Sequence, residues 1–490
     1  MTRPPLALIG AVGLLVAGTA VATVAGPAAP ARTSPARGVD VVGATAVCPD
    51  LRQGAGLTSR VSAGSAATGT GGSVHSSRLD PVAPAVSVRT AGPGQTAVAI
   101  GADVTNDALV VAADGPLAGG LEVEQLTRGD TGEDRGLAGL RCGPPTTEAW
   151  FLGGSSVVGE RTVLVLVNAD DVPALVDVTV STATGPQDPR PGEGFAVGPH
   201  SRTFVPLDTL AAGKDLLALH VHARRGRVAA AVRHSRYDGQ VSHGVEWVPP
   251  SLPPATAVVV PGLPAGPGHR YALVTNPGTD DTTVSIQVTT SDGQFLPTGF
   301  EAVDVPAGRT VRTELDPLTD RSALALRVVS TGAPVLAGGY VVDGPEGGSV
   351  TEIAYTTASL PLHGPALLTD VDLNPARRST LVLSALAGPG SVLLRPRPIA
   401  GGAAGLPAAR TVPVPAGRTS TVELSSLLTG AGDGRFALEV APAPGSAPVY
   451  AARYLTETGS DGPLTTLLDL QSPPEQVLRP AVQRDPGAAG

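Results

Sequence analysis

The string VPAGRT occupies Val305–Thr310 and returns at Val414–Thr419. A related string, GPHSRT at Gly198–Thr203, precedes the first copy by nearly the same interval. A weaker upstream copy is indicated by GPGQT at Gly92–Thr96. A second set of segments keeps the same step, namely RTVLVLVN from Arg161, RYALVTN from Arg270 and RSTLVLSA from Arg378. Segments that recur in one order, here at a period of about 108 residues, indicate an internal repeat.

Within each repeat the apolar residues alternate with polar ones, as in a half-buried β-strand. One example is the run of Val284, Ile286 and Val288. Val305–Gly308 fits a type I turn with Pro second and Gly fourth, so the repeated string is expected to join two strands. Six or seven short strands in about 100 residues predict an immunoglobulin-like sandwich. A propeller is less favoured, because a four-stranded blade takes only about 40 to 50 residues.

The predicted fold class is therefore all-β, with tandem immunoglobulin-like β-sandwich domains after one N-terminal hydrophobic helix. Proline-rich segments such as PPSLPP at Pro249–Pro254 are expected to join units as stiff spacers or edge strands. The predicted organisation is a signal anchor or signal peptide at 1–30, a linker at 31–47, a degenerate β unit closed by a disulfide at 48–148, β-sandwich units at 149–248, 249–357 and 358–470, and a disordered tail at 471–490.

Composition supports this class and excludes others. The chain has 490 residues, of which 62 are Gly and 48 are Pro, and this frequency of turn formers leaves little room for long helices. The net charge of −9 gives no basic face for phosphate, so nucleic acid is not expected as a partner.

The N-terminus predicts export. Leu6–Gly26 carries no charged residue and follows Arg3, a pattern typical of a membrane anchor. Ala20-Val21-Ala22 has the small-residue spacing of a signal-peptidase site, so a cleaved signal peptide is the alternative. Either way, the rest of the chain is expected outside the cytoplasm, anchored to the outer face of the cytoplasmic membrane or secreted.

Export gives a meaning to the two cysteines, Cys48 and Cys142. In an oxidising compartment an even count indicates one disulfide, and closing a loop of about 95 residues should stabilise the fold by roughly 4 to 5 kcal/mol. Two free buried thiols are the alternative.

The sequence predicts no catalytic residue, no cofactor and no metal. His220 and His222 are spaced i, i+2 and therefore share one face of a strand, as two metal ligands might. A hairpin turning near Arg225-Gly226 would place the third candidate, His234, on the opposite face. We therefore expected ordinary solvated histidines. No nucleophile elbow, phosphate loop or zinc-protease motif is present.

Three aromatic residues stand at predicted unit boundaries, namely Trp150, Trp247 and Tyr355. Each follows a glutamate by one to three positions, and these glutamates are Glu148, Glu246 and Glu352. Aromatic residues make up only 3% of the chain, so a carbohydrate-stacking platform has few candidates. The repeated placement favours aromatic plugs between domains over a sugar-binding surface.

CPDLRQG at Cys48–Gly54, RCGPPTTEAWFLGGSSVVG at Arg141–Gly159 and VEWVPP at Val245–Pro250 carry a resemblance. With them the chain resembles an actinobacterial family of exported, N-terminally anchored proteins of unknown function with tandem β-repeats, over roughly residues 45–470. The resemblance implies an envelope setting and supplies no catalytic residue.

We therefore expect a non-catalytic cell-envelope protein that serves as a structural spacer or protein-interaction scaffold. Its expected partners are envelope proteins or cell-wall polymer. The alternatives are a module that binds cell-wall glycans and, with less support, a secreted hydrolase.

Overall fold

A computed structural model describes residues 37–51, 56–67, 71–80, 98–100, 107–319, 322–344, 350–374, 376–399, 405–427 and 435–479. The expected N-terminal hydrophobic helix, the GPGQT string and residues 480–490 lie outside these ranges. Among the described residues, no helix is both long and apolar enough to cross a membrane.

The expected all-β class is confirmed. Within the described ranges, α-helix is limited to the four-residue segments α2 (Asp316–Thr319) and α3 (Leu424–Leu427). Short 3-10 segments are η1 (Gly115–Gly120), η2 (Gly132–Asp134), η3 (Arg190–Gly192) and η4 (Leu207–Thr209). The remaining elements are strands. Those between Val41 and Glu475 form four two-sheet sandwiches within one compact unit.

In each sandwich we call the four-stranded sheet whose edge strand is β8, β17, β27 or β35 the junction sheet, and the sheet packed against it the cover sheet. The first sandwich has the junction sheet β5-β3-β7-β8 and the cover sheet β2-β6-β4. Its strands are β2 (Gly43–Leu51), β3 (Leu57–Ser65), β4 (Val74–Arg78), β5 (Val98–Ile100), β6 (Asp107–Asp114), β7 (Leu121–Gly129) and β8 (Gly136–Arg141).

The second sandwich has the junction sheet β14-β10-β16-β17 and the cover sheet β12-β11-β15-β9-β18, with β13 also paired to β11. The proline-rich join thus supplies an edge strand, β18. The strands are β9 (Glu148–Leu152), β10 (Glu160–Asn168), β11 (Ala174–Thr182), β12 (Gly185–Pro186), β13 (Phe195–Val197), β14 (Ser201–Pro206), β15 (Ala218–Arg225), β16 (Ala229–Asp238), β17 (Val241–Val248) and β18 (Pro250–Ser251).

The third and fourth sandwiches repeat this plan. The third has the junction sheet β24-β20-β26-β27 and the cover sheet β19-β25-β21-β22, with β23 beside β21. Its strands are β19 (Ala257–Leu263), β20 (Gly268–Thr275), β21 (Thr282–Thr289), β22 (Gln294–Phe295), β23 (Val303–Val305), β24 (Thr310–Glu314), β25 (Leu324–Ser330), β26 (Leu336–Asp343) and β27 (Glu352–Thr357).

The fourth sandwich has the junction sheet β32-β29-β34-β35 and the cover sheet β28-β33-β30-β31. Its strands are β28 (Ala366–Asp372), β29 (Arg377–Ala385), β30 (Gly390–Arg397), β31 (Arg410–Val414), β32 (Arg418–Glu423), β33 (Arg435–Pro442), β34 (Tyr450–Gly459) and β35 (Gly462–Leu470).

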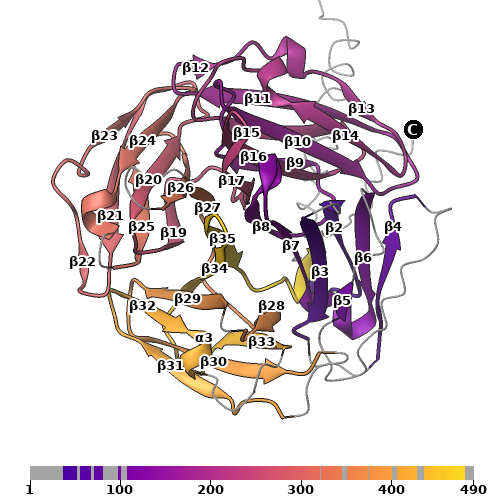
Figure 1. The fold of residues 1–490 in the computed structure, drawn as a ribbon, viewed down its shortest axis with the longest axis vertical. Coiled ribbons are helices and arrows are strands. Elements are labelled where there is room, and N and C mark those ends of the chain that lie inside the picture. The colour runs from indigo at the N-terminus through magenta and orange to yellow at the C-terminus, as the bar shows by residue number, and fades with distance from the viewer. Residues whose placement is uncertain are drawn as a thin grey trace, which may run out of the picture. The chain divides into compact units, whose positions relative to one another are not determined.

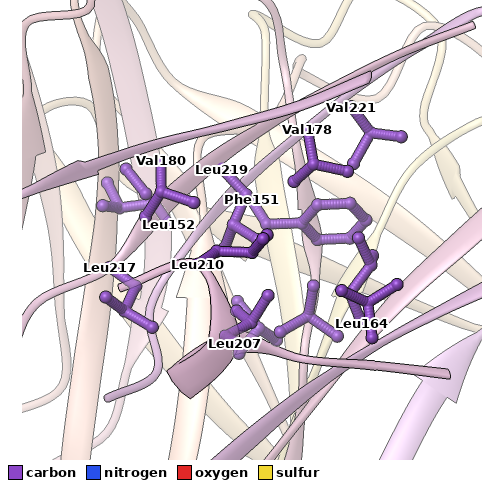
Figure 2. Packing of buried hydrophobic residues seen from close by; sticks show 14 of the residues in the cluster. Phe151, Leu152, Leu164, Val178, Val180, Leu207, Leu210, Leu217, Leu219 and Val221 are labelled. Atoms are coloured by element: carbon purple, nitrogen blue, oxygen red, sulfur yellow. The ribbon is translucent and has the colours of Figure 1, made fainter. Parts of the chain in front are cut away.

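The alternating valines fill the space between paired sheets, as their period predicts. In the second sandwich, Phe151 of β9 is fully buried and lies among Leu164, Val178 and Val221, as Figure 2 shows. Removing such a side chain typically costs about 3 to 5 kcal/mol, because the lost apolar contacts leave a cavity. This core fixes the face of β9 that remains for Glu148 and Trp150.

One predicted hairpin is wrong. The turn near Arg225-Gly226 does not pair β15 with β16, because the chain crosses there from the cover sheet to the junction sheet. His220 in β15 lies opposite Thr179 and Trp150, whereas His234 in β16 lies opposite Thr162 and Glu246. Polar–apolar alternation is the same whether two consecutive strands form a hairpin or belong to different sheets, so this pattern could not distinguish the two connections.

The turn in VPAGRT is one residue later than expected. Arg309 N–H donates to Pro306 O at 3.1 Å, and Gly308 takes a left-handed φ of 66°. In GPHSRT the same place is taken by His200, with φ 45°. Ser201 lies opposite Asn168 just as Arg418 lies opposite Ala385, so alignment of the repeats on the arginine of GPHSRT is also off by one residue.

This turn contacts the preceding sandwich, which gives the repeated string a second role. Arg309 forms an isolated parallel β-bridge with Thr182 of the second sandwich. In the next copy, Thr419 N–H donates to Thr290 O of the third sandwich at 2.9 Å.

A disulfide joins Cys48 of β2 to Cys142, the residue after β8, with the Cα atoms 4.8 Å apart. Both cysteines are buried in the core of the first sandwich. The bridge therefore ties the cover sheet to the end of the junction sheet.

The four sandwiches contact one another in a closed cycle rather than in a row. The last strand of each junction sheet takes part: β8 contacts β17, β17 contacts β27, β27 contacts β35, and β35 contacts β8 (Figure 1). Neighbours share apolar clusters, such as the one that joins Val245 and Trp247 of the second sandwich to Ala138 and Leu140 of the first. The repeat period alone did not indicate this closure.

Outside this unit, β1 (Arg37–Asp40) pairs antiparallel with β36 (Gln476–Arg479). Gly38 lies opposite Leu478, and Val39 lies opposite Val477. The segments that precede and follow the four sandwiches therefore form a two-stranded ladder of their own.

Candidate functional site

A cleft of about 200 Å³ opens where the second and third sandwiches meet, and we call it the tyrosine cleft. Its aromatic lining is Tyr271, Tyr340, Tyr355, His234 and His269. Its charged lining is Glu160, Asp215, Arg236 and Arg312. Three of the six tyrosines of the chain therefore line one cleft.

The tyrosines form a ladder because they stand opposite one another on adjacent strands. Tyr271 in β20 lies opposite Tyr340 in β26, which lies opposite Tyr355 in β27. Successive ring centroids are 6.0 Å and 4.8 Å apart, distances at which cross-strand aromatic pairs stabilise a sheet. The Arg312 guanidinium lies 4.9 Å from the centre of the Tyr271 ring, within cation–π range.

A chain of hydrogen bonds runs from this ladder into the second sandwich. Gly154 N–H donates to Tyr355 Oη at 3.1 Å, and Tyr355 Oη lies 2.8 Å from His234 Nδ1. His234 Nε2 lies 3.1 Å from Glu160 Oε2. The three bonds are compatible with one another when Tyr355 donates to Nδ1 and Nε2–H donates to Glu160.

The electrostatics of these groups disfavour acid–base chemistry by Tyr355. Burial raises the pKa of Tyr355 and Tyr340 well above the usual tyrosine value. Burial also acts to raise the pKa of Glu160, but His234 and Arg236 outweigh it and lower that pKa to about 2. Near neutral pH the cleft therefore presents protonated tyrosines beside an ionised carboxylate, an arrangement suited to binding through hydrogen bonds.

The three predicted aromatic residues have different surroundings. Trp247 is 2% exposed and lies in the apolar cluster between the first and second sandwiches. Tyr355 is equally buried, beside the tyrosine cleft. Trp150 instead stands on the outer face of a cover sheet, where its ring stacks on His220 with centroids 3.8 Å apart.

A second cluster lies on this outer face, and we call it the histidine–glutamate cluster: Glu148, His220 and His222. In β15, His222 lies opposite Glu148 of β9, and His220 lies two residues away on the same face. The carboxylate contacts both rings: Glu148 Oε2 meets His220 Nε2, and Oε1 lies 2.8 Å from His222 Nδ1.

The cluster changes the expectation for these histidines. Their rings are partly exposed, but one shared carboxylate holds them together. His234 does not belong to this cluster, because it is buried beside the tyrosine cleft. Its separation from His220 and His222 was predicted and is observed, although the hairpin from which we predicted it is wrong. Sequence reasoning missed the role of Glu148, since nothing local showed that β9 neighbours β15.

A larger cleft of about 600 Å³ lies between the third and fourth sandwiches. Hydroxyl groups and arginines dominate its lining, including Thr380, Thr421, Thr456, Arg378 and Arg418. Among the described residues, neither a carboxylate nor a histidine lines it. It therefore offers fewer kinds of functional group for binding or catalysis than the smaller tyrosine cleft.

Comparison with known protein families gives one match. The model of a family of unknown function (DUF5719) matches residues 95–425. The chain belongs to this DUF5719 family. A search of curated proteins found no match.

The DUF5719 match extends from the first sandwich into the fourth and includes both the tyrosine cleft and the histidine–glutamate cluster. It establishes the family and assigns no activity, ligand or partner. The disulfide between Cys48 and Cys142 is compatible with an extracytoplasmic DUF5719 protein, because such bonds persist in oxidising compartments.

Proposed function

We propose that this DUF5719 protein is a non-catalytic component of the cell envelope that acts as an interaction scaffold. The closed contact cycle of the four sandwiches is the observation that carries this proposal. Each junction sheet packs against two others through its last strand, so all four sandwiches can present their cover sheets and loops from one cooperative body.

The cycle favours a scaffold over a spacer. A spacer gains reach by keeping its domains in a row, whereas here β35 of the fourth sandwich packs against β8 of the first. Arg135, the residue before β8, also donates to Pro463 O of β35 at 2.8 Å. These contacts shorten the assembly and stiffen it.

The proposed location is extracytoplasmic, with the segment around Leu6–Gly26 as a membrane anchor or a cleaved signal peptide. The absence of charge in that segment and the disulfide support this location. The proposed partners are envelope proteins or cell-wall polymer.

The scaffold proposal can be tested by crosslinking intact cells with a membrane-impermeant reagent. Mass spectrometry then identifies the molecules that are crosslinked to the full-length chain. We expect reproducible crosslinks from described surface residues to envelope components. Protection of the chain from the impermeant reagent, with crosslinks appearing only after lysis, would refute the extracytoplasmic scaffold. Turnover of a wall substrate that Glu160→Gln abolishes would refute the non-catalytic assignment.

The tyrosine cleft favours a second candidate, a module that binds cell-wall glycans. Aromatic rings pack against sugar faces, and carboxylates and guanidiniums bind sugar hydroxyls. Tyr271 is partly exposed at the cleft, beside Arg312 and Asp215.

Binding to purified cell wall tests this candidate. Tyr271→Ala and Arg312→Ala should each reduce the bound fraction several-fold, while Tyr237→Ala, on β16 and outside the lining, serves as the matched control. Equal retention of all three variants would eliminate the cleft as a glycan site. Trp247 is unsuitable for this test because its replacement would report on packing.

A further inference from the structure

Three side chains of types that commonly bind metal ions lie close together on the outer face of the second cover sheet, on two adjacent strands. Of the described residues, only Glu148, His220 and His222 form a group of three with potential ligand atoms all within 4.8 Å of one another. Two imidazole nitrogens and a carboxylate oxygen form a ligand set typical of zinc and related divalent transition metals.

We propose that this histidine–glutamate cluster binds one divalent transition-metal ion, with Zn²⁺ as the probe of choice. His220 Nε2, His222 Nδ1 and a Glu148 oxygen would be its three ligands. The cluster is partly exposed, so the remaining coordination positions are open to water or to a donor from a bound partner. This ion would add a ligand-binding function to the proposed scaffold.

The positions of the ligands are fixed by the sheet. His220 and His222 project from the same face of β15 because side chains alternate along a strand. β15 is an interior strand, held by β11 on one side and by β9 on the other. A site built on paired strands needs little reorganisation to bind an ion.

Trp150 provides a further constraint. Its ring is nearly parallel to that of His220, with an interplanar angle of 6° and centroids 3.8 Å apart. The stacked indole holds the imidazole orientation and shields one face from water, an effect comparable to that of outer-shell residues in metal sites.

The neighbouring strand does not compete for the ion. Asp177 in β11 lies opposite His222. Its carboxylate, however, accepts hydrogen bonds from Arg224 Nε–H and Gly194 N–H, each at 2.8 Å. Thr179 lies opposite His220. Glu148 is thus the carboxylate that faces both histidines.

The chain also contains a matched control. His200 Nε2 lies 2.8 Å from Asp171 Oδ1, so a partly exposed histidine here pairs with a fully exposed carboxylate. This pair reproduces half of the cluster's chemistry without the second imidazole, so it should bind an ion far more weakly.

The proposal is tested by titrating Zn²⁺ into the folded, disulfide-bonded chain. The protein carries no histidine tag, and a chelator first removes any bound metal. The described residues include no free cysteine, so thiolates there cannot mimic the site. We expect one Zn²⁺ per chain at micromolar concentration. His220→Ala, His222→Ala and Glu148→Gln should each weaken binding at least tenfold, and His200→Ala should leave it unchanged.

Tryptophan fluorescence gives a second measurement, which does not require the replacement of a coordinating residue. Cu²⁺ bound at the cluster should quench Trp150, which stacks on His220, whereas the buried Trp247 lies in the apolar cluster between the first and second sandwiches. Trp150→Phe should therefore lose most of the quenching while it retains Zn²⁺ uptake. The proposal is overturned if the folded wild-type chain takes up no Zn²⁺, or if uptake persists unchanged in the three ligand variants.

Discussion

Two fully buried glutamates lie where the junction sheets meet. Glu246 Oε1 accepts Gly139 N–H of the first sandwich and its neighbour Trp247 N–H, each at 2.9 Å. Glu352 Oε1 accepts Val245 N–H at 3.0 Å. Burial raises the pKa of both carboxyls well above the usual glutamate value. Each carboxyl thus connects two sandwiches while favouring its uncharged form.

The raised pKa of Glu246 makes stability depend on pH. The folded chain keeps a proton that the unfolded chain releases above the ordinary value of 4.5, so the free energy of unfolding falls as the pH rises from there toward the raised pKa. Glu246→Gln keeps the acceptor oxygen and has no proton to lose. Relative to wild type, it should gain about 1 kcal/mol or more between pH 5 and pH 8.

Denaturant unfolding at the two pH values measures this gain. Glu314→Gln, at an exposed position of β24, is the control and should follow the wild type. The nearby Glu352, whose charge adds to the raised pKa of Glu246, is present in every variant. Parallel pH dependence of Glu246→Gln and wild type would contradict the prediction.

The two glycines of VPAGRT provide a matched pair. Gly308 and Gly417 have φ values of 66° and 63°, so alanine should cost roughly 1 to 2 kcal/mol at either place. At Gly308 a Cβ would also lie 2.7 Å from Pro186 Cδ of the second sandwich, whereas at Gly417 the nearest atom, Gln294 Cβ, is 3.8 Å away. Gly308→Ala should therefore destabilise the protein more than Gly417→Ala, as thermal unfolding would show. Equal losses would mean that the contact with Pro186 relaxes freely.

At the scale of strands, alternation identified the elements but not their partners. Val284, Ile286 and Val288 are fully buried, as their spacing predicted. Alternation records only which side chains share a face, so it could not show that β15 and β16 belong to different sheets. Pairing depends on contacts across the whole sandwich.

The histidine–glutamate cluster illustrates the same limit. The i, i+2 spacing of His220 and His222 predicted their common face. Their carboxylate, Glu148, comes 72 residues before His220. No local pattern connects residues that far apart, and the pairing of β9 with β15 alone brings them together.

The disulfide supports the sandwich with the smallest described cover sheet. Replacing both Cys48 and Cys142 with Ser should lower the free energy of unfolding by about 4 to 5 kcal/mol, because the unfolded chain regains the freedom of a long loop. Denaturant unfolding with and without reductant measures this loss. Reductant should destabilise the wild type and leave the double variant unaffected; an equal response from both would show that the bond contributes nothing.

For the whole molecule, closure of the cycle between the fourth and first sandwiches depends on buried polar groups. Arg453 is 2% exposed, and its Nη1 lies 3.5 Å from Glu124 Oε2 of the first sandwich. It also donates to Ser379 Oγ and to Asp370 O, each at 2.9 Å. Thr369 completes the contact through a 2.6 Å hydrogen bond to Ser62.

Removing Arg453 should weaken this closure selectively. Arg453→Met removes the buried arginine that faces Glu124, and breaking such a buried ion pair typically costs about 3 to 5 kcal/mol. Hydrogen exchange should rise first in β7, β8 and β28. Arg378→Met, which breaks the exposed pair with Glu423, should cost less than about 1 kcal/mol. Uniform exchange across all four sandwiches would argue against a separable closing contact.

The pairing of β1 with β36 has a mechanical consequence. Val41 N–H donates to Glu475 O at 3.0 Å, so the polypeptide enters and leaves the four sandwiches at one point. Tension applied between residues before Arg37 and after Arg479 would load this short ladder in a peeling direction, bond by bond. Such a load would then be relieved at this ladder, before it reached the hydrophobic cores of the four sandwiches.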